Sequence, residues 1–302
     1  MSSEVNKNRH KTQQEMVRSL TKSSQEYFRG IVGGVMFSLP MLYTMEVWWA
    51  GFSIEPLRMF LYVIATFSLL LGYNRYAGLR RDASRLEVVI DSVEELGLGI
   101  IVAAAFLWLL GRITAEMSFN EIAGKVIVEA MTVAIGVSVG TAQLGDNNNS
   151  KPDTGMHGDK NKLEIPSPAH KHIDFWGQVV IALCGAVLFA ANVAPTEEVI
   201  VIATQITSER LFTLALVSLI FGALILFYSN FMDAEKFTRS YSLFTIVSGT
   251  IVTYAIALVA SALILWFFGR FDGLPPIINL AETIVLALPA TLGASAGRIL
   301  LQ

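Results

Sequence analysis

Two glutamates in apolar segments carry the oxygen ligands best suited to a cation. Glu46 and Glu198 each follow a threonine by two residues, and Asn192 lies shortly before the second pair; the threonines are Thr44 and Thr196. Carboxylate, hydroxyl and amide oxygens suit hard cations, and a carboxyl group buried beside another can carry a proton instead. These five residues therefore form one candidate site for a cation or a proton, provided that the two segments converge.

The same glutamates also have a simpler interpretation. Trp48 and Trp49 follow Glu46 directly, and tryptophans mark the headgroup region of membrane proteins. Both acids would then lie in water at the outer interface. The sequence leaves both interpretations open.

Glu129 is a third candidate, because it lies about a third of the way into the apolar run 122–142. Carboxylates at membrane depth are costly and tend to be functional. Lys125 lies one helical turn earlier and could form an ion pair with Glu129 at i,i+4 spacing. Glu129 is thus expected either to act in the function or to form a structural ion pair.

The motifs of familiar enzymes are missing from the sequence. Two Gly-x-Ser-x-Gly runs, 136–140 and 293–297, look like a nucleophile elbow, but that motif needs a strand, a following helix and a histidine partner. Here both lie in segments expected to be apolar helices, where small residues let helices approach closely; those residues are Gly136, Gly140, Gly293 and Gly297. We expect no enzyme, no cofactor and no resident metal.

The composition is that of a membrane protein. Of the 302 residues, 53% are hydrophobic and 16% are charged, against about a quarter charged in soluble domains. Apolar runs near the length of about 20 residues that a helix needs to cross a bilayer recur throughout the chain. The lipid bilayer is the expected partner, and nothing points to nucleic acid.

Windows of this length predict an all-α, polytopic protein with eight transmembrane helices. Residues 1–28 form a polar, cytoplasmic N-terminal tail without a signal-peptide core, and residues 145–173 form a polar linker expected to be flexible. The predicted spans are 30–48, 56–73, 93–111, 122–142, 175–194, 211–229, 243–268 and 282–301.

Basic residues fall mainly on one side of this arrangement. With eight spans, 17 of the 22 lysines and arginines lie on the side of both termini. Cytoplasmic loops carry such an excess. Both termini are therefore expected in the cytoplasm, and the opposite face is net acidic.

The two halves of the chain match each other in order. Residues 29–144 and 174–302 would each be a four-helix repeat, and an even number of spans gives both the same orientation, as in parallel repeats. In this alignment Glu282 corresponds to Lys125. The matched segments are 33–37 with 185–189, 107–112 with 265–270, and 136–140 with 293–297.

The repeated Thr-x-Glu-Val, Leu-Trp-x-x-Gly-Arg and Gly-x-Ser-x-Gly elements resemble a family of bacterial integral membrane proteins known only as a domain of unknown function. The likeness covers residues 29–302. The resemblance implies a bacterial inner membrane and implies no substrate.

The leading functional hypothesis is a transporter of a small cation, or one coupled to protons, with acids between the repeats. The alternatives are a non-transporting anchor or sensor with a cytoplasmic partner, and an ion channel in which the acids form a selectivity ring. Burial of Glu46, Glu129 and Glu198 around a polar cavity would favour transport or conduction. Exposure of all three would favour the anchor.

Overall fold

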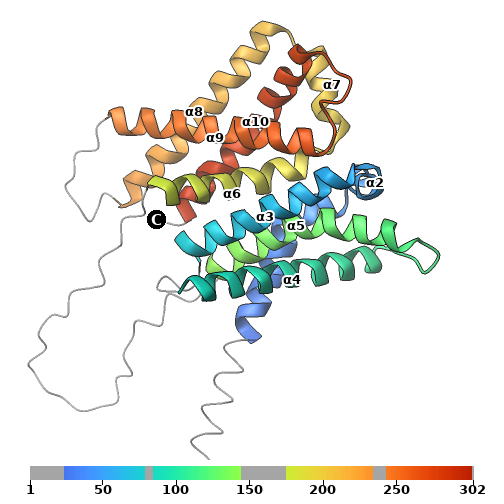
Figure 1. Ribbon diagram of the computed structural model, residues 1–302. Helices are drawn as coiled ribbons and strands as arrows, with labels where there is room; N and C mark the ends of the chain where they lie inside the picture. Colours follow the sequence, from blue (N-terminus) through green and yellow to red (C-terminus); the bar gives the residue numbers. More distant parts are fainter. Residues whose placement is uncertain (1–23, 79–83, 144–174, 234–242, 301–302) are drawn as a thin grey trace, which may run out of the picture.

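The computed structural model describes residues 24–78, 84–143, 175–233 and 243–300, and these ranges contain helices and no strand (Figure 1). The predicted linker 145–173 and residues 1–23 of the predicted tail lie outside them. The helices are the first helix Ser24–Leu42, α2 Met45–Ser53, α3 Pro56–Tyr76, α4 Arg85–Leu109, α5 Phe119–Gln143, α6 Phe175–Val193, α7 Glu197–Gln205, α8 Ser208–Asp233, α9 Leu243–Phe267 and α10 Pro276–Leu300.

The prediction of an all-α, polytopic membrane protein is confirmed. Seven of the described helices, α3 to α6 and α8 to α10, are long and apolar enough to cross a membrane. The first helix and α2 together make an eighth if they are counted as one broken span, but they meet at an angle of 87°.

The predicted span 30–48 is therefore broken: it contains most of the first helix and the start of α2. The chain leaves the helix after Leu42, and Thr44 adopts an extended conformation before α2 begins. Pro40 contributes to this end, because it has no N–H for the helical ladder. α2 and α7 are nine residues each; α2 extends beyond the predicted span 30–48, and α7 lies wholly between two predicted spans.

The first helix with α2–α5, and α6–α10, form two groups that lie one against the other in Figure 1. α3 packs against α6 and α9, and α5 also touches α6. In each group the short helix packs on the last long one, α2 on α5 and α7 on α10. The halves are thus joined mainly through α3 and α6.

Corresponding turns of the two groups have the same backbone. Two residues after the end of α4 and of α9 stands a glycine with positive φ, 68° at Gly111 and 70° at Gly269. In both turns the amide of the following arginine, Arg112 or Arg270, donates to a carbonyl five residues earlier. This is a common helix ending, and it favours glycine because L side chains are strained at positive φ.

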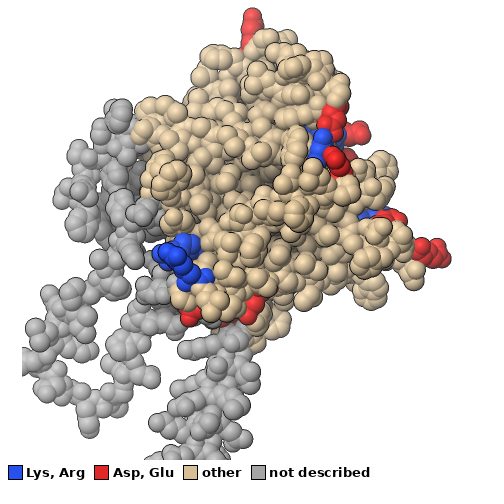
Figure 2. Space-filling view, viewed as in Figure 1, with Lys and Arg blue, Asp and Glu red and all other residues tan. Residues whose placement is uncertain are grey.

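α5 lies deepest in the molecule, whereas α8 faces outward. In the apolar window of α5, 83% of the residues are buried, against 17% in that of α8. Large apolar side chains on α8 and the neighbouring long helices are correspondingly exposed, as expected for surfaces that face lipid. Figure 2 shows the same property on one face, where a wide uncharged area separates charged groups near opposite ends of the bundle.

Candidate functional site

Glu46 and Glu198 lie in the first turns of α2 and α7, in positions that the bundle does not enclose. Glu46 is half-buried and Glu198 is exposed. The hydroxyl of Thr44 donates to the carbonyl of Pro40 at 2.6 Å, and that of Thr196 donates to the carbonyl of Val193 at 2.8 Å. The threonines thus bond to their own backbone. Within the described ranges, no three His, Cys, Asp or Glu side chains converge to hold a metal ion.

Asn192 bonds to the backbone of the first helix. The amide N–H of Met41 donates to Asn192 Oδ1 at 3.0 Å, and Asn192 Nδ2 donates to the carbonyl of Phe37 at 2.8 Å. In an unbroken helix, Met41 N–H would bond to the Phe37 carbonyl directly. The Asn192 amide is inserted into that one bond, next to Pro40, and so connects α6 to the first helix.

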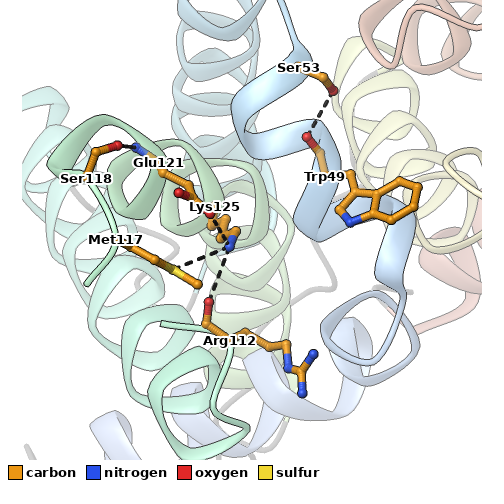
Figure 3. Close-up of polar contacts among 7 residues, drawn as sticks. All are labelled: Trp49, Ser53, Arg112, Met117, Ser118, Glu121 and Lys125. Atoms are coloured by element: carbon orange, nitrogen blue, oxygen red, sulfur yellow. Dashed lines mark hydrogen bonds and ion pairs between the residues drawn. The ribbon is translucent and has the colours of Figure 1, made fainter. Parts of the chain in front are cut away.

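Glu129 on α5 is fully buried, and neither of its carboxyl oxygens has a hydrogen-bond partner among the described residues. The alternative of a Lys125–Glu129 ion pair is wrong. Lys125 Nζ bonds instead to Glu121 Oε1 at 2.8 Å, one turn in the other direction. Figure 3 shows that the ammonium group also points toward the Arg112 carbonyl, at 3.4 Å, and the Met117 sulfur, at 3.5 Å.

The surroundings of Glu129 bring the two halves together. Thr132, one turn further along α5, is hydrogen-bonded to the hydroxyl of Tyr62 on α3 at 3.1 Å. Tyr62 is near enough to Glu129 for an electrostatic interaction, and its ring stacks on Phe267 of α9 with centroids 4.0 Å apart. Glu129 therefore lies one turn of α5 from a contact in which helices of both halves meet. Sequence reasoning missed Tyr62, because a tyrosine in an apolar run carries no sign of its contacts.

Glu282 on α10 is a second fully buried acid without a hydrogen-bond partner among the described residues. The sequence placed it opposite Lys125 in the repeat but did not single it out as a site. Glu282 could have been predicted as a candidate from the sequence, since it is an acid at the start of the apolar run 282–301.

A polar network lies toward the other end of the bundle. Asn74 Nδ2 donates to Glu95 Oε2 at 2.6 Å and to Ser92 Oγ at 3.1 Å, and the hydroxyl of Ser138 donates to Asn74 Oδ1 at 3.1 Å. Ser138 is the serine of the first Gly-x-Ser-x-Gly run, and it joins α5 to α3. Sequence reasoning missed the network, because its members lie on three different helices, α3, α4 and α5, and as much as 64 residues apart in the chain.

The four glycines of these runs lie at helix crossings. On α5, the Gly136 carbonyl and Gly140 face Gly33 of the first helix, so closely that a Cβ on Gly33 would lie 2.7 Å from that carbonyl. On α10, Gly293 faces Gly185 of α6, and a Cβ on Gly297 would lie 2.9 Å from the Ile181 carbonyl. Each crossing is thus a contact of backbone with backbone.

Arg58 and Asp272 form a bidentate ion pair between the halves, near the start of α3 and after the end of α9. Arg58 Nη1 lies 2.7 Å from Asp272 Oδ2, and Nη2 lies 2.8 Å from Oδ1. The guanidinium group also lies over the Trp266 ring, 5.2 Å from its centroid. The hydrogen bonds from Arg58 hold the pKa of the Asp272 carboxyl below its ordinary value.

The pair predicts a pH dependence. A carboxyl group with a lowered folded-state pKa stabilises the fold above its unfolded pKa, about 3.9, and this contribution is lost as the pH falls through the lowered value. We expect Asp272→Asn to lower the free energy of unfolding at pH 7 by at most about 1 kcal/mol, and to reduce the loss of stability below pH 4. Thermal unfolding in detergent between pH 2.5 and 7 measures both effects. Glu209→Gln, which removes an exposed acid of α8, is the control, and equal pH profiles for wild type and Asp272→Asn would contradict the prediction.

Comparison with known proteins agrees with this architecture. The model of one family of integral membrane proteins matches residues 26–301, nearly the whole chain. The resemblance found in the repeated motifs is thereby confirmed. No curated protein and no solved structure matches the chain.

Proposed function

Since the chain belongs to the family described as "Putative integral membrane protein (DUF2391)", we propose that it carries a small cation or a proton across a bacterial inner membrane, with Glu129 as the exchanging group. The observation that supports this most is the full burial of Glu129, without a hydrogen-bond partner among the described residues, in a membrane-spanning helix. Such a group is stable there when it holds a proton or a cation. Gain and loss of that charge inside the bundle is what a coupled carrier requires.

The position of Glu129 supports the same proposal. Residues 29–144 and 174–302 are proposed to be parallel repeats of one four-helix unit, and the equal lengths of α2 and α7, of α4 and α9, and of α5 and α10 support this. Carriers built from repeats bind their substrates between the halves. Glu129 lies beside such a contact, the stack of Tyr62 on Phe267.

Orientation follows from the basic residues. With 17 of the 22 lysines and arginines on the side of the termini, both ends of the chain are proposed to be cytoplasmic. Glu46 and Glu198 then belong to the outer face, together with Thr44 and Thr196. Acids at an entrance raise the local concentration of cations. We therefore propose that these two glutamates attract cations and that Glu129 exchanges the cation or proton.

The test measures ion flux across the membranes of liposomes that contain the purified full-length protein. Gradients of K⁺, Na⁺, Ca²⁺, Mg²⁺ and protons are imposed in turn, and uptake is compared with that of empty liposomes. We expect flux under at least one gradient, its abolition by Glu129→Gln, and a partial loss in a Glu46→Gln/Glu198→Gln double variant.

Glu209→Gln is the matched control, because it removes an exposed carboxylate outside the proposed pathway and should leave the flux unchanged. Flux that survives in Glu129→Gln would remove Glu129 from the mechanism. Absence of flux from folded protein under every gradient would favour the anchor or sensor. Flux that does not saturate with ion concentration would favour the channel.

A further inference from the structure

The second half of the bundle has an acid where the first half has a lysine. At an offset of 157 residues Glu282 corresponds to Lys125, and at 158 Arg270 corresponds to Arg112. In the first half the chain supplies both the positive charge and its ligands, since Lys125 Nζ contacts Glu121, the Arg112 carbonyl and the Met117 sulfur. The residue that corresponds to Glu121 is the apolar Ile278. The second half thus has neither the lysine ammonium nor the acid that binds it.

Glu282 has an unusual environment for a carboxylate. It is fully buried, and both of its carboxyl oxygens have no hydrogen-bond partner among the described residues. Asn279 Oδ1, three residues earlier, is also buried and without such a partner. Residues three apart lie on one face of a helix, about 4.5 Å apart along its axis. Three oxygen acceptors without a partner among the described residues therefore share one face of α10, a helix on which α7 packs.

We propose that Glu282 and the side-chain carbonyl of Asn279 bind a small monovalent cation, at the place where the first half puts the ammonium group of Lys125. Oxygen acceptors are the ligands of alkali and other hard cations, whereas softer metals prefer sulfur and imidazole. One carboxylate beside one neutral amide carries a single negative charge, so one positive charge neutralises the site. The buried oxygens then gain the partner that burial otherwise denies them.

Arg270 is a charged group close enough to Glu282 to act on it electrostatically. Its guanidinium group bonds to the carbonyl of Pro195, just before α7, rather than to the Glu282 carboxylate. Arg270 therefore leaves the carboxylate oxygens available, while its charge weakens the attraction of a second cation. This also favours a monovalent ion over a divalent one.

The proposal concerns binding and does not depend on transport. Purified full-length protein in detergent and choline chloride is titrated with radioactive ²²Na⁺, and bound ion is counted by scintillation proximity. We expect saturable binding of about one Na⁺ per chain, displaced by unlabelled Na⁺ and not by choline. Glu282→Gln should abolish binding, and Asn279→Leu should weaken it on the order of tenfold, since one of the ligands is lost.

Glu209→Gln is the matched control and should bind Na⁺ as the wild type does. If Glu282→Gln fails to fold, as judged by gel filtration and circular dichroism, the graded loss in Asn279→Leu decides. Full binding in either folded variant would place the ion elsewhere and overturn the assignment. Absence of saturable binding to folded wild type between pH 5 and 9 would also overturn it, and would leave Glu282 as a carboxyl group that holds a proton.

Discussion

Gly185→Ala is expected to lower the free energy of unfolding by about 3 kcal/mol, since inserting a methyl group into close packing typically costs 1–3 kcal/mol and backbone neighbours yield least. A Cβ on Gly185 would collide with the carbonyl oxygen of Gly293 and lie 2.9 Å from its carbonyl carbon. These are backbone atoms of α10, and they cannot rotate away as side-chain atoms could. α6 and α10 would have to separate along their whole crossing.

The matched control is Gly97→Ala on α4, where an added Cβ meets nothing within 4 Å. Alanine is the better helix former by about 1 kcal/mol, so Gly97→Ala should be neutral or slightly stabilising. Unfolding followed by circular dichroism in detergent compares the two variants with wild type. Equal stabilities of Gly185→Ala and Gly97→Ala would show that the crossing is looser than the structure has it.

Asn192→Leu is expected to lower the free energy of unfolding by about 2–4 kcal/mol. The substitution keeps much of the side-chain volume but leaves the amide of Met41 and the carbonyl of Phe37 without the bonds that Asn192 gives them. Each buried polar group that loses its partner costs about 1–3 kcal/mol. The loss should also loosen the contact between the halves, because Asn192 belongs to α6 and both backbone groups belong to the first helix.

Thermal unfolding measures the first effect, and limited proteolysis of the native protein measures the second. Asn120→Leu, at an exposed position near the start of α5, controls for the exchange of asparagine for leucine. An Asn192→Leu variant as stable as Asn120→Leu would mean that Met41 and Phe37 recover a direct helical bond.

The long helices could be predicted from the sequence, because a span of about 20 apolar residues is a strong signal on its own. A break near Pro40 could be anticipated, because proline interrupts the hydrogen-bond ladder of a helix, but its position after Leu42 could not. Proline occurs in transmembrane helices that continue through it, when neighbouring groups satisfy the freed backbone. Whether Pro40 ends a helix therefore depends on contacts from elsewhere in the chain. α2 and α7 escaped prediction because nine residues are too few to stand out as a span.

Glu129 could be predicted as a candidate, since a charge inside an apolar run is visible in the sequence. Its partners could not. Lys125 lies one turn from both Glu121 and Glu129; an acid that precedes the lysine at i,i+4 is the more favourable arrangement, but this preference is small and does not by itself decide the partner. The structure decides for Glu121 because that pair lies at the open start of α5, where the Arg112 carbonyl also reaches the lysine. Contacts such as Tyr62 with Phe267 join residues more than 200 positions apart and leave no local pattern.

The insertion of Asn192 into the first helix has a consequence for the order of synthesis. The first helix, which is synthesised before α6, completes its hydrogen bonds only after residue 192 has been made and α6 has docked against it. Until then, the Phe37 carbonyl and the Met41 amide need another partner. The N-terminal half, expressed alone, should therefore insert into the membrane less efficiently than the same half in the full chain. Its insertion should recover when the second half is supplied as a separate polypeptide.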